Sequence, residues 1–229
     1  MKLAAFFSGG KDSTYSIYKQ RKLGMEISCL ITIEPISEES TLLHYPNTKW
    51  TKLQSNAMNI PQILVKAKSY SLDSELYDLK EALQIARNKF QIRGIVHGGI
   101  KSNYQREKFK NLGKHVGLEI FSPLWNVSPK QYMADLLAEK FDFIITSVSA
   151  DGLDDSWLGK KITCNDLAKL ELLSKRYGFN LNFEGGEAET FVTNCPMFSS
   201  SIVINNSQKV WDGYRGRFEI EEADLKNIA

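Results

Sequence analysis

The sequence predicts an α/β protein: a parallel five-stranded sheet flanked by helices, followed by a smaller C-terminal α+β domain. Short apolar runs alternate with helix-period segments through the first half of the chain, which implies right-handed crossovers and a parallel sheet. Beyond Ser122 the pattern changes to two helices, a strand and a hairpin. The composition, 42% hydrophobic and 24% charged, is typical of a globular protein. We therefore expect domains at residues 1–121 and 122–229.

Five strands are expected in the first domain, each a short apolar run. They cover residues 2–7, 27–33, 62–66, 94–97 and 118–121. The first ends in Ser-Gly-Gly, the second is rich in β-branched residues, and the last ends in Ser-Pro. In such open sheets, ligands bind at the carboxyl ends of the strands near a topological switch point, so the loops after the strands are the places to search.

Helices are expected between these strands, at residues 12–22, 74–90 and 102–116. The clearest is 74–90, because Leu76, Leu79, Leu83 and Ala86 recur at helical spacing and predict a stripe that faces the core. Residues 34–59 have few periodic apolar positions and are interrupted by prolines. We expect a long loop there, of the kind that is usually functional or mobile.

The second domain is expected to contain helices at residues 129–140 and 163–177, with a strand at 141–148 between them. Residues 201–205 and 209–212 predict a hairpin around Asn206-Ser207-Gln208. Residues 218–220 add one further short strand.

Charge and cysteine content exclude several classes of protein. Lys and Arg number 29 against 27 Asp and Glu, so the net charge of +2 gives neither a basic nucleic-acid tail nor an acidic disordered domain. No apolar run approaches the ~20 residues of a membrane helix, and the N-terminal apolar stretch is too short for a signal peptide. The three cysteines, Cys29, Cys164 and Cys195, form no CxxC pair. We expect a reducing, cytoplasmic compartment without a disulfide framework.

One motif carries chemistry directly: the run Ser8-Gly9-Gly10-Lys11-Asp12-Ser13 between the first strand and the first helix. The two glycines allow several backbone N–H groups to converge, and the helix adds its unpaired N–H groups and the positive end of its dipole. The serines add hydroxyl donors and the lysine adds a cation. Such a concavity suits a pyrophosphate, although the spacing is too short for the common GxxxxGK[ST] loop.

This run resembles the SGGxDS loop (PP-loop) of the N-type ATP pyrophosphatases. The resemblance implies a HUP or Rossmann-like nucleotide-binding sheet and a loop that holds the pyrophosphate end of ATP. It also implies attack on the α-phosphate, with an adenylate formed and pyrophosphate released. Asp12 is the nearest candidate ligand for Mg²⁺, which prefers carboxylate, phosphate and water oxygens. Gly98 and Gly99, after the fourth strand, are expected to line the same nucleotide pocket.

Four further segments resemble signatures of the diphthine–ammonia ligases. They are the EGGExET-like run 184–192, the GLDxSWLG-like run 149–159, the GxIxSxYQR-like run 97–106, and Pro123-Leu124-Trp125. His44-Tyr45-Pro46-Asn47 resembles a fifth. The matches follow the family order over most of the chain. Two positions depart from the pattern: Ala188 replaces a frequent aromatic, and Lys160 replaces an expected Arg. Because the chain also lacks the extra C-terminal domain of the eukaryotic members, the resemblance is to the short, archaeal type.

The resemblance implies that ATP adenylates the carboxylate of diphthine, a modified histidine of translation elongation factor 2, and that ammonia then displaces AMP. Lys11 and Asp12 are expected to act in catalysis with Glu187 and Glu189, one of which holds ammonium and accepts its proton. We favour Glu187 slightly, because adjacent glycines let a ligand approach closely. The expected substrate-binding residues are His44, Asn47, Tyr104, Arg106, Asp151, Gly152, Asp155, Trp157, Glu184, Gly185, Gly186, Glu187 and Thr190.

Alternatives from other classes stay open at this point. A tRNA thiolase generally needs reactive cysteines or a metal cluster and a basic surface, and a glutamine-dependent synthetase commonly needs Cys directly after the initiator Met, where this chain has Lys2. A non-catalytic ATP sensor would bind ATP without releasing pyrophosphate. Stable nucleic-acid binding is not expected. The sequence is compatible with a homodimer.

Overall fold

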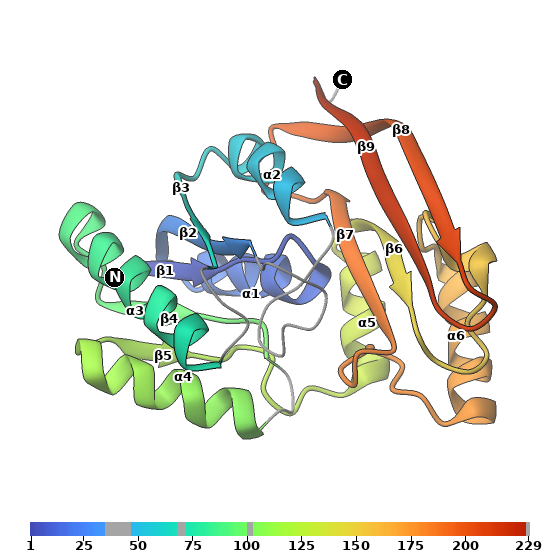
Figure 1. Ribbon diagram of the computed structural model, residues 1–229, viewed down its shortest axis with the longest axis horizontal. Helices are drawn as coiled ribbons and strands as arrows, with labels where there is room; N and C mark the ends of the chain where they lie inside the picture. Colours follow the sequence, from blue (N-terminus) through green and yellow to red (C-terminus); the bar gives the residue numbers. More distant parts are fainter. Residues whose placement is uncertain (35–46, 68–71, 100–102, 228–229) are drawn as a thin grey trace. The chain divides into compact units, whose positions relative to one another are not determined.

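The chain folds into two compact units, Met1–Trp125 and Asn126–Ala229, in a computed structural model (Figure 1). The structure describes residues 1–34, 47–67, 72–99 and 103–227. Within these ranges, no helix combines the length and the apolar character needed to cross a bilayer.

The first unit is built on a parallel five-stranded sheet with the order β3-β2-β1-β4-β5. Its strands are β1 (Lys2–Phe6), β2 (Glu26–Glu34), β3 (Gln62–Lys66), β4 (Gly94–Val96) and β5 (Glu119–Phe121). The predicted fold class is confirmed, and each predicted strand of this sheet agrees to within one residue at either end. Strands β1 and β4 are neighbours on either side of the topological switch. The loops that follow them therefore lie side by side at the carboxyl ends of the strands.

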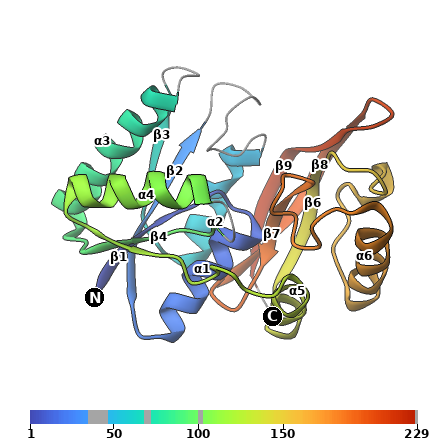
Figure 2. The same cartoon turned by 90° about the horizontal axis from the view of Figure 1, so that it is seen from below.

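In the described part of the chain, four α-helices connect these strands. They are α1 (Lys11–Lys22), α2 (Thr51–Met58), α3 (Leu72–Phe90) and α4 (Asn103–Val116). Helices α3 and α4 cover one face of the sheet and α1 lies on the other (Figure 2). Leu79, Leu83 and Ala86 are buried in the core under α3, which confirms that stripe, while the side chain of Leu76 lies outside the described residues.

The expectation of a continuous loop over residues 34–59 is wrong for its second half. A 3₁₀ turn, η1 (Asn47–Trp50), leads directly into α2. Of the buried face of α2, Thr51, Gln54 and Ser55 are polar and only Ala57 and Met58 are apolar. The pattern of hydrophobic residues therefore carried no helical signal, because this helix packs through hydrogen bonds rather than through an apolar stripe.

The second unit contains an antiparallel four-stranded sheet with the order β7-β6-β9-β8. Its strands are β6 (Asp142–Val148), β7 (Ala188–Asn194), β8 (Ser200–Trp211) and β9 (Gly216–Asn227). Helices α5 (Pro129–Ala138) and α6 (Cys164–Tyr177) contact each other. Strand β7 was not among the predicted elements.

The predicted hairpin around residues 206–208 is wrong. Strand β8 runs through those residues, with irregular pairing to β9 on either side of Asn206. The turn lies instead after Trp211, where Asp212 Oδ1 accepts hydrogen bonds from the N–H groups of Tyr214 and Arg215 at 2.8 and 2.6 Å. These bonds from the Arg215 and Tyr214 amides hold the pKa of Asp212 below its usual value. The Asp-Gly pair was the true turn signal, and the polar run was an exposed strand with a bulge.

Candidate active site

The Ser-Gly-Gly loop, residues 8–13, joins β1 to α1 and is held by its own hydroxyl groups. Ser13 Oγ donates to the Gly10 carbonyl at 3.2 Å and accepts from the Ser8 N–H at 3.3 Å, while Thr14 Oγ1 donates to the same carbonyl at 2.8 Å. Gly10 is the N-cap of α1 and has no side chain with which to cap the helix. The loop therefore presents the amino end of a 12-residue helix, which suits an anion such as a phosphate.

Lys11 places a buried cation in this loop. Its side chain is only 2% exposed, and its Nζ lies 3.0 Å from both carboxylate oxygens of Asp12, which is itself 34% exposed. A buried ammonium group needs such a partner, because desolvation of an unpaired charge is costly. The pair lies at the positive end of the α1 dipole, which favours the binding of an anion such as a phosphate there.

Asp12 fits the role predicted for it as a Mg²⁺ ligand. Among the described residues, no group of three His, Cys, Asp or Glu side chains could hold a metal ion by itself. Mg²⁺ commonly binds through one or two carboxylates and takes its other ligands from substrate phosphates and water. A single accessible carboxylate beside a loop predicted to bind phosphate meets that requirement.

Gly98, after β4, packs directly against the first turn of α1. A Cβ atom built on Gly98 would lie 2.7 Å from both the Asp12 carbonyl carbon and the Ser13 backbone nitrogen. Only glycine allows this approach, since real Cβ atoms essentially never come so close to another backbone. The structure thus brings Gly98 together with the Ser-Gly-Gly loop, as expected for two segments of one nucleotide site.

Gln54 of α2 supports the same loop and was missed by sequence reasoning. Its Nε2 donates to the Gly9 carbonyl at 2.8 Å, and its side chain is fully buried. Gly9 has a φ of +81°, and a Cβ there would come 2.4 Å from Gln54 Oε1. The signal was present in the buried polar positions of α2, but only the fold shows that they face the loop.

In the second unit, two of the predicted signatures meet at the ends of β6 and β7. Ser149 follows β6, and its N–H donates to the Glu187 carbonyl at 2.9 Å while its Oγ donates to the Gly186 carbonyl at 2.7 Å. Glu189 and Thr190 lie on β7, paired with Ser147 and Ile145 of β6. The runs 149–159 and 184–192 are therefore neighbours in space.

The acidic turn, residues 184–187, is shaped by its own glutamate. Glu187 Oε1 accepts from the backbone N–H and the side-chain Nδ2 of Asn180 at 2.8 and 2.6 Å, and Oε2 accepts from the Gly185 N–H at 2.7 Å. Gly185 and Gly186 are exposed and Glu184 is half-buried. The Glu187 carboxylate thus fixes the turn, so its predicted role as the ammonium acceptor would require some of these bonds to be exchanged.

The neighbouring run 151–160 is ordered by a second set of contacts. Asp154 Oδ1 accepts from the Ser156 N–H at 3.0 Å and caps the 3₁₀ turn η2 (Asp155–Trp157). Asp151 and Asp155 are exposed, whereas Trp157 is 6% exposed, so its indole belongs to the core. Gly152 packs against the ring of Tyr177.

Lys160, in the place of an expected arginine, links this run to α6. Its Nζ lies 2.6 Å from Asp166 Oδ1 and 5.0 Å from the centre of the Trp157 ring. Burial acts to raise the pKa of Asp166, but hydrogen bonds from Lys160 and Thr163 outweigh it and hold that pKa below its usual value. Thr163 and Asp166 form a reciprocal capping box at the start of α6. Lys160 therefore ties this run to the start of α6 through an ion pair.

Two family models cover the chain almost from end to end. Residues 1–120 match the diphthamide synthase N-terminal domain, and residues 128–225 match the diphthamide synthase C-terminal domain. The chain belongs to the diphthamide synthase family.

Members of the diphthamide synthase family from mammals are similar over nearly the whole chain. The diphthine–ammonia ligases of Bos taurus and Rattus norvegicus are 31% and 32% identical to it, over 92% of this chain and 85% of theirs. The Schizosaccharomyces pombe protein of the same name is 27% identical, but only 37% of its length is covered. The match therefore spans most of the mammalian relatives and little more than a third of the fungal one.

A solved structure of a predicted tRNA methyltransferase subunit from Methanocaldococcus jannaschii aligns with 86% of this chain and 98% of its own. Its TM-score is 0.43 and its identity 19%, a likeness too distant to bear on fold or function.

Several residues that the diphthamide synthase resemblance singled out are only partly placed. His44 lies outside the described residues, and so do the side chains of Tyr104 and Arg106, whose backbone forms the first turns of α4. Asn47 begins η1 and is 8% exposed, which places it beside α2 in the first unit. Their assignment to substrate binding stays a prediction.

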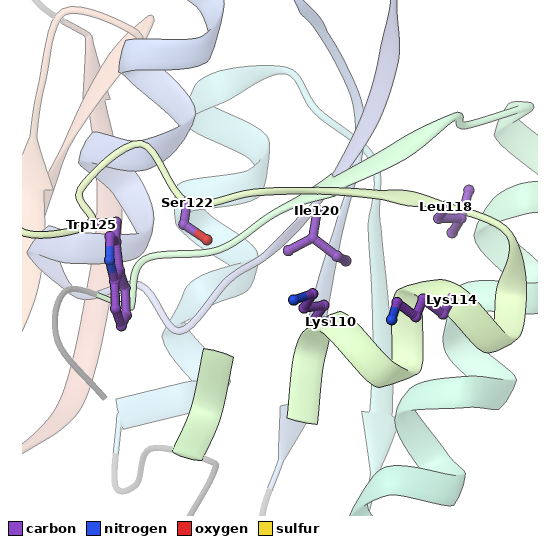
Figure 3. Close-up of a pocket in the computed structure, with 6 residues that line it drawn as sticks. All are labelled: Lys110, Lys114, Leu118, Ile120, Ser122 and Trp125. Carbon is purple, nitrogen blue, oxygen red and sulfur yellow. The ribbon is translucent and has the colours of Figure 1, made fainter. Parts of the chain in front are cut away.

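Trp125, of the Pro123-Leu124-Trp125 segment, lines a cavity of about 470 Å³ along α4 and β5 (Figure 3). The other described lining residues are Lys110, Lys114, Leu118, Ile120 and Ser122. Figure 3 shows them in a row, with Trp125 and Lys114 toward opposite ends. The cavity thus runs from the carboxyl end of β5 toward its amino end, beside the edge of the sheet.

Proposed function

We propose that this chain amidates diphthine on translation elongation factor 2 to diphthamide, using ATP, Mg²⁺ and ammonium. A diphthine carboxylate oxygen attacks the α-phosphorus of ATP, and pyrophosphate leaves. The nitrogen of ammonia then attacks the acyl carbon, a proton is lost to a base, and AMP leaves with its bonding pair. The observation that carries the proposal is the Ser-Gly-Gly loop with buried Lys11, in a chain matched by both domain models of diphthamide synthase.

In the first unit, we assign the pyrophosphate end of ATP to the backbone N–H groups at the start of α1 and to Lys11. Attack by a carboxylate on ATP brings two anions together, so charge neutralisation dominates the barrier. Lys11 Nζ would exchange its contact with Asp12 for a phosphate oxygen, which leaves the Asp12 carboxylate to hold Mg²⁺. When bound, Mg²⁺ supplies further neutralisation of the phosphate charge.

In the second unit, we assign ammonium to the acidic turn and β7. Glu187 shapes the turn through three hydrogen bonds, and Glu189 lies two residues further along on β7. A carboxylate in this group would hold ammonium and accept the proton that amide formation releases. Asp151 and Asp155 are accessible for contact with the protein substrate, whereas the buried Trp157 supports them from the core.

The test is a complete reaction with the full chain. Diphthine-bearing elongation factor 2 is incubated with ATP, Mg²⁺ and ammonium, and AMP is quantified together with the mass of the factor. The proposal expects stoichiometric AMP and a loss of about one mass unit on the factor, as a carboxyl becomes an amide. ATP binding without factor-dependent AMP would indicate a sensor, and AMP that depends on tRNA instead would indicate the thiolation alternative; either result would overturn the proposal.

A further inference from the structure

His97 lies immediately after β4 and takes no part in the reaction steps above. Its side chain is 2% exposed. The Gly99 N–H donates to His97 Nδ1 at 3.1 Å, and His97 Nε2 lies 2.6 Å from Ser122 Oγ. The ring also packs against Phe109 of α4, with 4.9 Å between ring centres. The imidazole thus joins the loop after β4 to the segment after β5.

These two bonds define the state of the ring. Nδ1 accepts a hydrogen bond and therefore carries no proton. The ring proton is then on Nε2, which donates a hydrogen bond to Ser122 Oγ. His97 is a neutral bridge between Gly99 on one side and Ser122 on the other. Ser122 is half-buried and also lines the cavity beside β5.

Gly98, between His97 and Gly99, has no freedom to shift toward α1. Its α-carbon packs so closely on the Asp12–Ser13 peptide that a Cβ would lie 2.7 Å from two backbone atoms. The next residue, Gly99, is held by the hydrogen bond from its N–H to His97 Nδ1. The position of Gly98 is therefore set both by its contact with α1 and by the hydrogen bond of its neighbour.

We propose that His97 is a positioning residue for ATP binding, which holds Gly98 and Gly99 against the first turn of α1 through the Nδ1 contact, with Ser122 fixing the ring. This inference rests on the assignment of the Ser-Gly-Gly loop to ATP. The competing view is that His97 only fills space in the core beside Phe109. In that case, any variant that preserves packing would preserve ATP affinity. It would not matter whether the variant keeps the contact with Gly99 or the contact with Ser122.

Two substitutions separate the contacts of the ring. In His97→Asn, Oδ1 occupies the place of Nδ1 and can accept from Gly99, but the Ser122 contact is lost. In His97→Gln, the terminal amide reaches the place of Nε2 and can contact Ser122, but the acceptor for Gly99 is lost. Ser122→Ala removes only the outer contact.

The experiment measures the Kd of the full chain for ATP by calorimetry, with no elongation factor present, and then the KM for ATP and kcat in the complete reaction. We expect His97→Gln to raise Kd and KM about fivefold to tenfold, which is the size of one lost hydrogen bond. The kcat should stay within twofold of the unmodified value. His97→Asn and Ser122→Ala should each raise Kd by only about twofold. In the His97→Asn background, Ser122→Ala should add nothing further, because the contact it removes is already lost.

Thermal unfolding of each variant checks that it is still folded. Equal weakening by His97→Asn and His97→Gln, or additive effects of His97→Asn and Ser122→Ala, would overturn the inference, as would unchanged ATP affinity in His97→Gln. If the unmodified chain binds ATP but does not amidate diphthine, the proposed function fails while the positioning role of His97 can still be scored from Kd.

Discussion

The Ser-Gly-Gly loop of the first unit and the acidic turn of the second are both glycine-bearing turns beside a strand, yet they use their charged side chains in opposite ways. In the first, the loop backbone is fixed by neutral groups, namely Ser13, Thr14 and Gln54, and Lys11 is held beside the end of a helix. In the second, the charged Glu187 is itself the group that fixes the backbone. A charged residue in a motif is therefore assigned to chemistry more securely where other groups already hold its loop.

The largest expected effect comes from Lys11→Met, which keeps the length of the side chain and removes the charge. We expect kcat/KM for ATP to fall by about 10² to 10³, because a preorganised charge opposite the phosphates is lost. AMP formation under saturating diphthine and ammonium measures it. Lys19→Met on the same helix is the matched control and should leave the rate unchanged. A loss of less than about threefold in Lys11→Met, well under the cost of one charge-assisted hydrogen bond, would remove Lys11 from the mechanism.

Gly98→Ala tests the packing of the two loops of the first unit. The added methyl would lie 2.7 Å from the backbone of Asp12 and Ser13, so α1 and the loop after β4 must separate. We expect ATP affinity to fall about tenfold or more, equivalent to ~1.4 kcal/mol, measured by calorimetry. Gly24→Asn is a suitable control, because a Cβ at Gly24 meets nothing within 4 Å and asparagine tolerates its positive φ. Wild-type affinity in Gly98→Ala would show that ATP does not depend on this contact.

The two units also differ in what their sequence could predict. The parallel sheet and the Ser-Gly-Gly loop follow from short apolar runs and local glycine chemistry, and the fold class is confirmed. Helix α2 was missed because Thr51, Gln54 and Ser55 are buried through hydrogen bonds, which leave no apolar period. The support of Gly9 by Gln54 could not be predicted, since 45 residues separate them and only the sheet order brings them together. In the second unit, strand β8 was interpreted as a hairpin because its exposed polar residues resemble a turn.

Glu187→Gln tests the opposite use of charge in the acidic turn. The amide keeps one acceptor oxygen but opposes its NH₂ group to a backbone or side-chain donor of Asn180 or Gly185. We expect a loss of about 1–2 kcal/mol of stability, loss of amidation, and unchanged affinity for ATP. Chemical unfolding, mass analysis of the elongation factor and calorimetry measure the three. Glu221→Gln, exposed on β9, is the control. If Glu187→Gln abolishes ATP binding, or amidates at the normal rate, the role assigned to this turn is wrong.

The smallest expected effect concerns Asp166, the charged group that anchors the run 151–160 of the second unit. Its pKa is lower in the folded protein than in the unfolded chain, so its carboxylate stabilises the fold at neutral pH. That contribution is lost as the pH falls below about 4 and the carboxylate takes up a proton. We expect Asp166→Asn to cost about 1 kcal/mol at pH 7, the size of a helix cap, and to differ less from the unmodified chain as the pH falls through that range. Thermal unfolding of both proteins between pH 3 and pH 7 measures the difference, and Asp151→Asn serves as the exposed control. A difference in stability that stays constant with pH would mean that Asp166 acts through packing alone. The ion pair between Lys160 and Asp166 would then contribute nothing to the stability of the second unit.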